Sequence, residues 1–117
     1  HRQTEQTISQ GWEEFGYLID PHTAVAFRVL EEYRQSTGDD TTAVVASTAS
    51  PFKFCTSVLN ALGVKEHKKG VEILDQLSEQ TGISVPAPLA ALKGKARRFD
   101  AVTEKAGMIE QVLEFLR

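Results

Sequence analysis

The sequence is poor in several residue types, and each shortage excludes a class of protein. Cys55 is the only cysteine among 117 residues, so no intramolecular disulfide can form, which fits a reducing compartment. No apolar run approaches the length of a membrane span, and no secretory signal is visible. The net charge of −3 offers no broad attraction for nucleic acid or an anionic membrane. We therefore expect a cytoplasmic protein that has neither nucleic acid nor membrane as a partner.

The three histidines are too scattered to indicate a metal centre. His1, His22 and His67 lack zinc-type spacing and supporting cysteines, so we predict no metal site. His1 is open to interpretation as a tag remnant, and we interpret His67, in a charged stretch, as a solvated surface residue. His22 lies in the first turn of a predicted helix. The sequence leaves two roles open for its side chain, which are to line a site or to support the structure.

What the sequence does contain is the composition of a globular domain. Hydrophobic residues make up 41% and charged residues 25%, which are ordinary values, and 117 residues suffice to bury one core. We predict a helix-rich α/β chain in which residues 1–117 form a single segment. The sequence begins with His1, not Met, inside helix-like sequence, so we expect a piece of a longer polypeptide.

Apolar residues at helical spacing predict five longer helices. Asp20-Pro21 and Ser50-Pro51 are cap-then-proline openings, since the cap accepts from free amides and proline presets the first helical residue. Two prolines in three residues make 83–88 an extended connector, followed by only a turn or so of helix at 89–92. The predicted helices cover about 4–15, 21–37, 51–62, 71–81 and 104–116.

One stretch, about 43–48, reads as a strand, because small and β-branched apolar residues lie between polar turns. A single strand cannot satisfy its own backbone groups, so it must pair within another copy or within a missing remainder of the chain. We expect its backbone to be the best protected in the structure. Residues 96–102 alternate weakly, which gives one or two short strands in all.

The predicted strand ends in hydroxyls and turns into a helix, which is a binding geometry in open α/β sheets. Ser47 and Thr48 stand at the strand end, Ser50 caps the helix, and Lys53 lies in its first turn. These four residues are the candidate site residues. Turns of this composition are also common connectors that bind nothing.

Residues 18–26 and 47–54 resemble two motifs of the threonine synthase family, in the same order. The patterns are (D/E)PH-x-AV(A/G) at a helix start and TA-x-P-x-KF at a turn, and residues 112–116 are also similar. The resemblance implies the carboxyl-terminal part of a tryptophan-synthase-like, fold type II enzyme that depends on pyridoxal phosphate. Such an enzyme converts O-phosphohomoserine and water to threonine and phosphate, and the cofactor acts as its electron sink.

The resemblance also implies roles for residues. Thr48 matches the hydroxyl that meets the pyridine nitrogen of the cofactor, with Ser47 as runner-up. The possible site-lining residues are Ser50, Lys53 and His22. Many members have His where this chain has Ser50, and a small residue at position 52, so those roles are not carried over. The Schiff-base lysine and the phosphate loop of the family lie far upstream. We therefore expect no catalytic residue here and an inactive isolated segment, with the remainder of the same polypeptide as its partner.

Two other interpretations remain open at this stage. The chain could be a small non-enzymatic helical interaction domain that pairs its strand with a partner chain, or part of another fold type II pyridoxal-phosphate enzyme. A reading frame that extends several hundred residues upstream and contains a lysine after a buried strand would favour the enzyme. A start codon just before His1 would favour the interaction domain.

Overall fold

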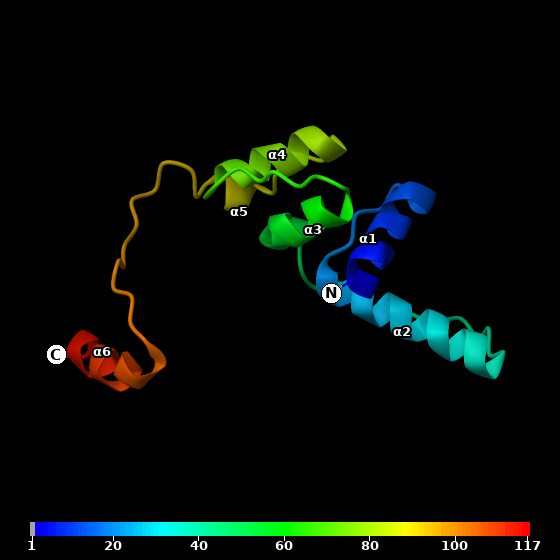
Figure 1. Cartoon of the computed structure of the whole chain (residues 1–117), viewed down its shortest axis with the longest axis horizontal. Coiled ribbons are helices and arrows are strands. Elements are labelled where there is room, and N and C mark those ends of the chain that lie inside the picture. Colours follow the sequence, from blue (N-terminus) through cyan, green and yellow to red (C-terminus); the bar gives the residue numbers. More distant parts are fainter. Residues whose placement is uncertain (1) are drawn as a thin grey trace.

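The computed structural model describes residues 2–117, so His1 and its interpretation as a tag remnant lie outside the described residues. Within this range the chain is helix-rich, as predicted, and all five longer helices are confirmed (Figure 1). The predicted α/β class is not confirmed, because residues 2–117 form no strand. Two short 3-10 turns, η1 and η2, lead directly into helices α3 and α6. The elements are α1 Arg2–Phe15, α2 Pro21–Thr37, η1 Pro51–Phe54, α3 Cys55–Ala61, α4 Glu72–Thr81, α5 Ala87–Ala90, η2 Lys105–Gly107 and α6 Met108–Phe115.

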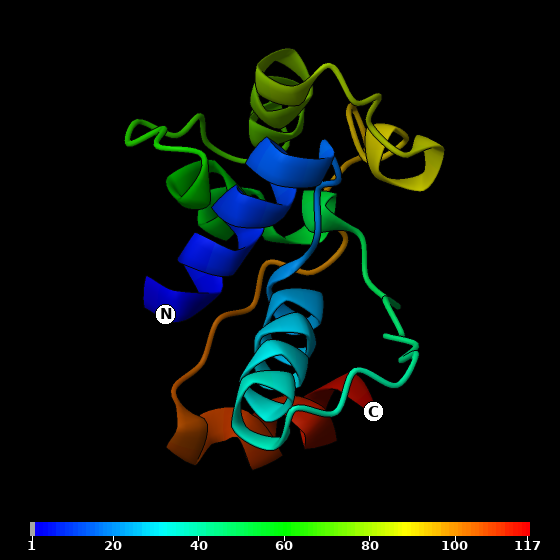
Figure 2. The same cartoon turned by 90° about the vertical axis from the view of Figure 1, so that its right-hand side faces the viewer.

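The core lies where α1, α3 and α4 pack together with the first turn of α2 (Figure 2). Ile8, Leu59 and Leu77, one from each of these three helices, are fully buried. Trp12, partly buried, packs against the same cluster. The other buried apolar residues are Leu18, Ile19, Ala24, Phe52, Cys55, Val58 and Leu74.

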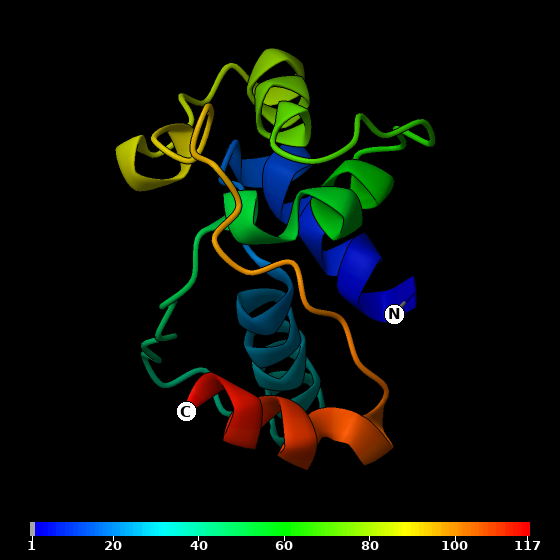
Figure 3. The ribbon, with the colours of Figure 1, turned by 90° about the vertical axis from the view of Figure 1, so that its left-hand side faces the viewer.

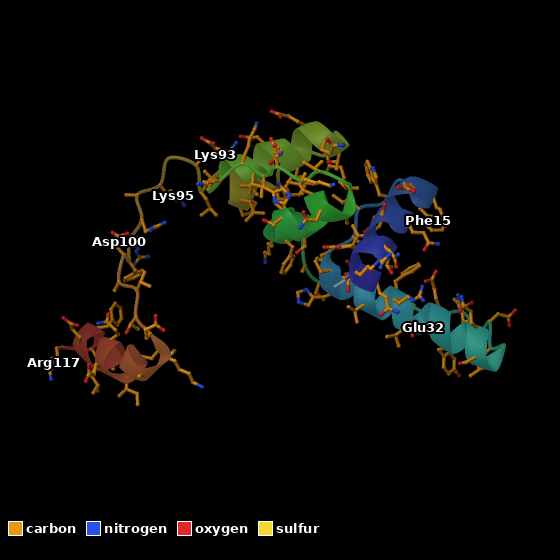
Figure 4. The ribbon with its side chains drawn as sticks, in the orientation of Figure 1. Phe15, Glu32, Lys93, Lys95, Asp100 and Arg117 are labelled. Atoms are coloured by element: carbon orange, nitrogen blue, oxygen red, sulfur yellow. The ribbon has the colours of Figure 1, made fainter. Side chains whose placement is uncertain are left out.

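Large apolar faces outside this core stay uncovered by residues 2–117. The distal part of α2 projects from the core, and Val29 and Tyr33 on it are 59% and 50% exposed (Figure 1). Helix α6 stands apart at the end of an extended tether (Figures 1 and 4), on which Lys95 and Asp100 are labelled in Figure 4. Figure 3 shows the course of this tether from the side of α6. The radius of gyration is 18.4 Å, whereas a compact domain of this length has about 13 Å. The core therefore organises only part of the chain.

The predicted strand is not formed within residues 2–117. Residues 43–48 run extended along α2, but they make no backbone hydrogen bond among the described residues, and Val44 is 93% exposed. The expectation of a well-protected backbone is wrong for the same reason. A strand needs a neighbouring strand, and a helix cannot supply the ladder of hydrogen bonds. Residues 96–102, the second strand-like stretch, are likewise extended and exposed.

The connectors otherwise follow the sequence closely. The short helix α5 begins at Ala87 and contains Pro88 in its first turn, so the extended connector ends at Pro86, two residues earlier than predicted. Proline is tolerated there because the first helical N–H groups have no partner within the helix. No helix among residues 2–117 combines the length and the apolar character that crossing a bilayer requires.

The exposure of α6 can be tested by comparing two leucines in the chain. Leu59→Ala opens a cavity in the core and should lower the free energy of unfolding by about 2–5 kcal/mol. Leu113, 54% exposed on α6, should cost less than about 1 kcal/mol when changed to Ala, because little apolar area is lost. Urea unfolding of both variants measures the difference. Equal losses would mean that α6 is packed against the core in solution.

Candidate functional site

The site is built around the carboxylate of Asp20, at the start of α2. Asp20 is the N-cap of this helix and Pro21 occupies its first turn, as the sequence predicts. One carboxylate oxygen accepts from the backbone N–H of His22 at 2.9 Å, and the other accepts from the hydroxyl of Thr23. Asp20 is only 1% exposed, so these bonds supply the partners that water would otherwise provide.

The surroundings of Asp20 keep its carboxyl ionised. Burial by itself raises the pKa of this group, but the hydrogen bonds from the Thr23 hydroxyl and from the backbone and ring of His22 outweigh burial. The net pKa of Asp20 lies below its ordinary value. A carboxylate that accepts several hydrogen bonds is held in its charged form, so Asp20 is a fixed negative charge at neutral pH.

A hydroxyl relay joins this helix start to the end of residues 43–48. The oxygen of Thr23 lies 2.9 Å from Ser47 Oγ. Because a carboxylate is acceptor-only, the single proton of Thr23 is committed to Asp20, and Ser47 donates the bond to Thr23. The relay brings together the two stretches, 18–26 and 47–54, that carry the predicted motifs.

A second contact between the same stretches involves aromatic rings. The rings of His22 and Phe54 meet edge to face, with centroids 5.0 Å apart and planes at 67°. The turn that carries Phe54 is held by two further contacts. Phe52 is buried in the core, and the hydroxyl of Ser50 accepts from Phe52 N at 3.3 Å. The helix start and the turn are therefore held in one arrangement by polar and aromatic contacts.

The structure separates the predicted site residues into two groups. Ser47 lies in the relay just described, and the ring of His22 contacts the same carboxylate of Asp20. Ser50 serves as the predicted cap of η1. Thr48 is exposed, and its hydroxyl has no hydrogen-bond partner among residues 2–117. Lys53 is exposed and forms no ion pair within the described residues.

The sequence analysis missed Asp20, Thr23 and Phe54 as members of the site. Asp20 was recognised only as a helix cap, and its burial and its link to Ser47 depend on contacts between distant parts of the chain. Phe54 lies in η1, and the contact of its ring with His22 also joins distant parts of the chain. Two features of the sequence could have indicated the link from Asp20 to Ser47: the acidic cap itself, and the hydroxyl residues Ser47 and Thr48 at the predicted strand end.

Two other residues are Cys55 and His67. Cys55 is buried in the core, and burial raises the pKa of its thiol. His67 is half-buried, not fully solvated, and its Nε2 lies 3.0 Å from the carbonyl oxygen of Val64. Among residues 2–117, no three His, Cys, Asp or Glu side chains gather in a way that would hold a metal ion.

Comparison with known proteins assigns the family. The family model "Threonine synthase, C-terminal" matches residues 23–113, which include the 47–54 turn and most of the helices. The chain belongs to the threonine synthase C-terminal family. This confirms the resemblance inferred from the two motifs.

Individual relatives agree with this family. Threonine synthase from Methylobacillus glycogenes is 29% identical over 113 residues, which cover 97% of this chain and 20% of the relative. Threonine synthase-like 1 from Mus musculus is 39% identical over 59 residues, or 50% of this chain and 8% of the relative. The chain thus spans about a fifth of the first relative and a smaller share of the second.

The hydrogen bonds of Asp20 predict how acid affects the fold. The lowered pKa means that ionised Asp20 stabilises the fold above its unfolded-state pKa, near 4, and that this contribution is lost as pH falls through the folded-state pKa. Asp20→Ala removes the cap and should cost about 0.5–2 kcal/mol at pH 7. Asp20→Asn should cost less, because its amide oxygen still caps, and its deficit should shrink in acid.

Urea unfolding between pH 3 and pH 8 measures these differences, and Asp40→Asn, at an exposed position, is the control. A deficit of Asp20→Asn that stays constant with pH would show that the charge of Asp20 contributes nothing to folding.

Proposed function

We propose that this chain is the carboxyl-terminal segment of a cytoplasmic threonine synthase, which converts O-phosphohomoserine and water to threonine and phosphate with pyridoxal phosphate. Residues 1–117 would form one segment of a larger catalytic domain of the tryptophan-synthase-like type. Family membership supports the parent enzyme. The observation that carries the site is the relay from Asp20 through Thr23 to Ser47, because it joins the two motif stretches at one place.

The hydroxyls at this place fit the pyridine ring of the cofactor. A neutral ring nitrogen accepts a hydrogen bond, so it needs a donor with a free proton. Ser47 donates its proton to Thr23, whereas Thr48 is exposed and has no partner within residues 2–117. The geometry therefore supports Thr48 over Ser47 as the residue that holds the ring nitrogen. Once bound, the cofactor would supply an electron sink for carbanion chemistry.

The remaining candidate residues take supporting roles in this proposal. Ser50 fixes the turn after Thr48 as a helix cap, and its hydroxyl is used by Phe52 N. Lys53 would be a cation near the anionic groups of cofactor and substrate, because it is exposed in the turn that the relay anchors. The lysine that bonds covalently to the cofactor would lie in the remainder of the polypeptide, so this segment alone would be inactive.

The uncovered surfaces support a larger parent protein. Residues 43–48 present unpaired backbone groups, and a groove between them and α2 is lined by Ala26, Val29, Leu30, Tyr33 and the four apolar residues 43–46. Unpaired backbone edges and exposed apolar faces associate with other chain segments. We propose that strands from the remainder of the polypeptide pair with 43–48, and that α6 packs on the same remainder.

An interaction domain without catalytic function would explain the uncovered faces equally well. It would not explain why two motifs of a pyridoxal-phosphate enzyme meet through the Asp20 relay. Another enzyme of the same class would also use a hydroxyl at position 48, since fold does not fix the substrate. Turnover of O-phosphohomoserine by the natural polypeptide that contains this chain distinguishes these possibilities.

Three substitutions of Thr48 in that polypeptide test the cofactor contact. Thr48→Ala removes a hydrogen bond worth about 0.5–1.5 kcal/mol, so cofactor affinity should fall modestly. Thr48→Ser keeps the hydroxyl and should be mildest. Thr48→Asp should reduce turnover most, because a carboxylate favours a protonated ring nitrogen and changes which carbanion is stabilised. Turnover, the cofactor absorbance spectrum and the melting temperature are measured together.

Thr42→Ala is the matched control, since Thr42 is an exposed threonine before the same extended segment. It should leave turnover and spectrum unchanged. If Thr48→Ala and Thr48→Asp are both harmless to turnover, Thr48 does not contact the cofactor. Losses that follow melting temperature in all three variants, with an unshifted spectrum, would show a structural role instead.

A further inference from the structure

The imidazole of His22 is held on one edge and open on the other. Its Nδ1 lies 3.1 Å from Asp20 Oδ1, and its ring meets Phe54 edge to face. The side chain is nevertheless 75% exposed. These contacts bury little of the ring, so their main effect is to fix its orientation.

The carboxylate of Asp20 decides which ring nitrogen carries the proton. An ionised carboxylate only accepts hydrogen bonds, so Nδ1 must donate and must carry a hydrogen. A neutral imidazole has a single N–H, so Nε2 is left with a free lone pair. The buried, ionised Asp20 thus makes Nε2 of His22 an exposed hydrogen-bond acceptor.

Capping of α2 does not require this ring. Asp20 caps the helix through the backbone N–H of His22, which any residue except proline would supply. His67 shows the contrasting case, because it is half-buried and its Nε2 bonds to the backbone carbonyl of Val64. Of these two rings, that of His22 is the more exposed, and its unprotonated nitrogen is Nε2, whereas the bond to Val64 leaves Nδ1 as the unprotonated nitrogen of His67.

The position of His22 connects it to the proposed site. Its neighbour Thr23 is bonded to Ser47, which immediately precedes Thr48, and its ring contacts Phe54 in the turn that follows. We propose that His22 Nε2 accepts a proton from an O–H donor bound at this site. The identity of this donor rests on the proposed function: it is the water that is added to the substrate.

The proton transfer is balanced by groups already in place. The O–H bond of the water breaks as the Nε2–H bond forms, the electron pair left on the oxygen forms the new C–O bond to the substrate carbon, and the ring becomes a cation. The negative charge of Asp20, 3.1 Å from Nδ1, offsets that positive charge. This is the arrangement of a general base that is oriented and stabilised by a carboxylate.

His22→Asn in the natural polypeptide tests this role. The Asn amide can still donate to Asp20 from near the position of Nδ1, while the acceptor at Nε2 is lost. Release of phosphate and formation of threonine are measured separately from O-phosphohomoserine. Threonine formation should fall about 100-fold or more, the usual loss of a general base, while phosphate release falls less, so that threonine formed per phosphate released decreases. His67→Asn is the matched control and should leave both rates unchanged.

The protonation of the ring is a second measurement that does not depend on activity. In the polypeptide labelled with 15N-histidine, nuclear magnetic resonance should show neutral His22 protonated at Nδ1 and bare at Nε2. Asp20→Ala should abolish this preference, because it removes the oxygen that accepts from Nδ1. A wild-type ring protonated at Nε2 would overturn the inference, as would unchanged rates of both products in His22→Asn.

The two proposals fail in different ways. A wild-type polypeptide that forms no threonine would refute the proposed function, and the resonance measurement would still decide whether Nε2 is an acceptor. A wild-type polypeptide that forms threonine, with a His22→Asn variant that matches it, would refute only the role of His22.

Discussion

The hydrogen bonds to the buried carboxylate of Asp20 are the interaction on which the site depends. They cap α2, orient the ring of His22, and hold the hydroxyl of Thr23 so that Ser47 can bond to it. Removing the carboxylate would therefore affect the helix start and the turn together. A buried negative charge is costly unless it is fully paired, and here each oxygen has a donor. The site is thus organised by one buried anion.

The fold positions this anion but leaves much apolar surface open. The core formed by α1, α3, α4 and the start of α2 fixes the site from one side, while the distal part of α2, residues 43–48 and α6 stay exposed. The site and the uncovered faces share the segment 43–48, whose end carries Thr48. In our proposal, the parts of the parent enzyme that cover this segment also complete the cofactor site.

Local features of the sequence predicted the helices well, because a helix satisfies its own backbone. Asp20-Pro21 and Ser50-Pro51 opened helices as expected, since capping depends only on neighbouring residues. The strand at 43–48 could not be confirmed in the same way, because it requires partners outside the described residues. The bond between Thr23 and Ser47 joins residues 24 positions apart, and no local pattern encodes such a contact. Hence the residues of the site were partly predictable, but their connections were not.

A crystal structure of the natural polypeptide with pyridoxal phosphate bound tests the central claim most directly. Our account predicts that Thr48 Oγ1 lies within hydrogen-bonding distance of the ring nitrogen, about 2.7–3.2 Å. It also predicts that Ser47 remains bonded to Thr23 beside the buried carboxylate of Asp20. A ring nitrogen that faces a carboxylate, or a cofactor bound away from residues 47–54, would contradict the account.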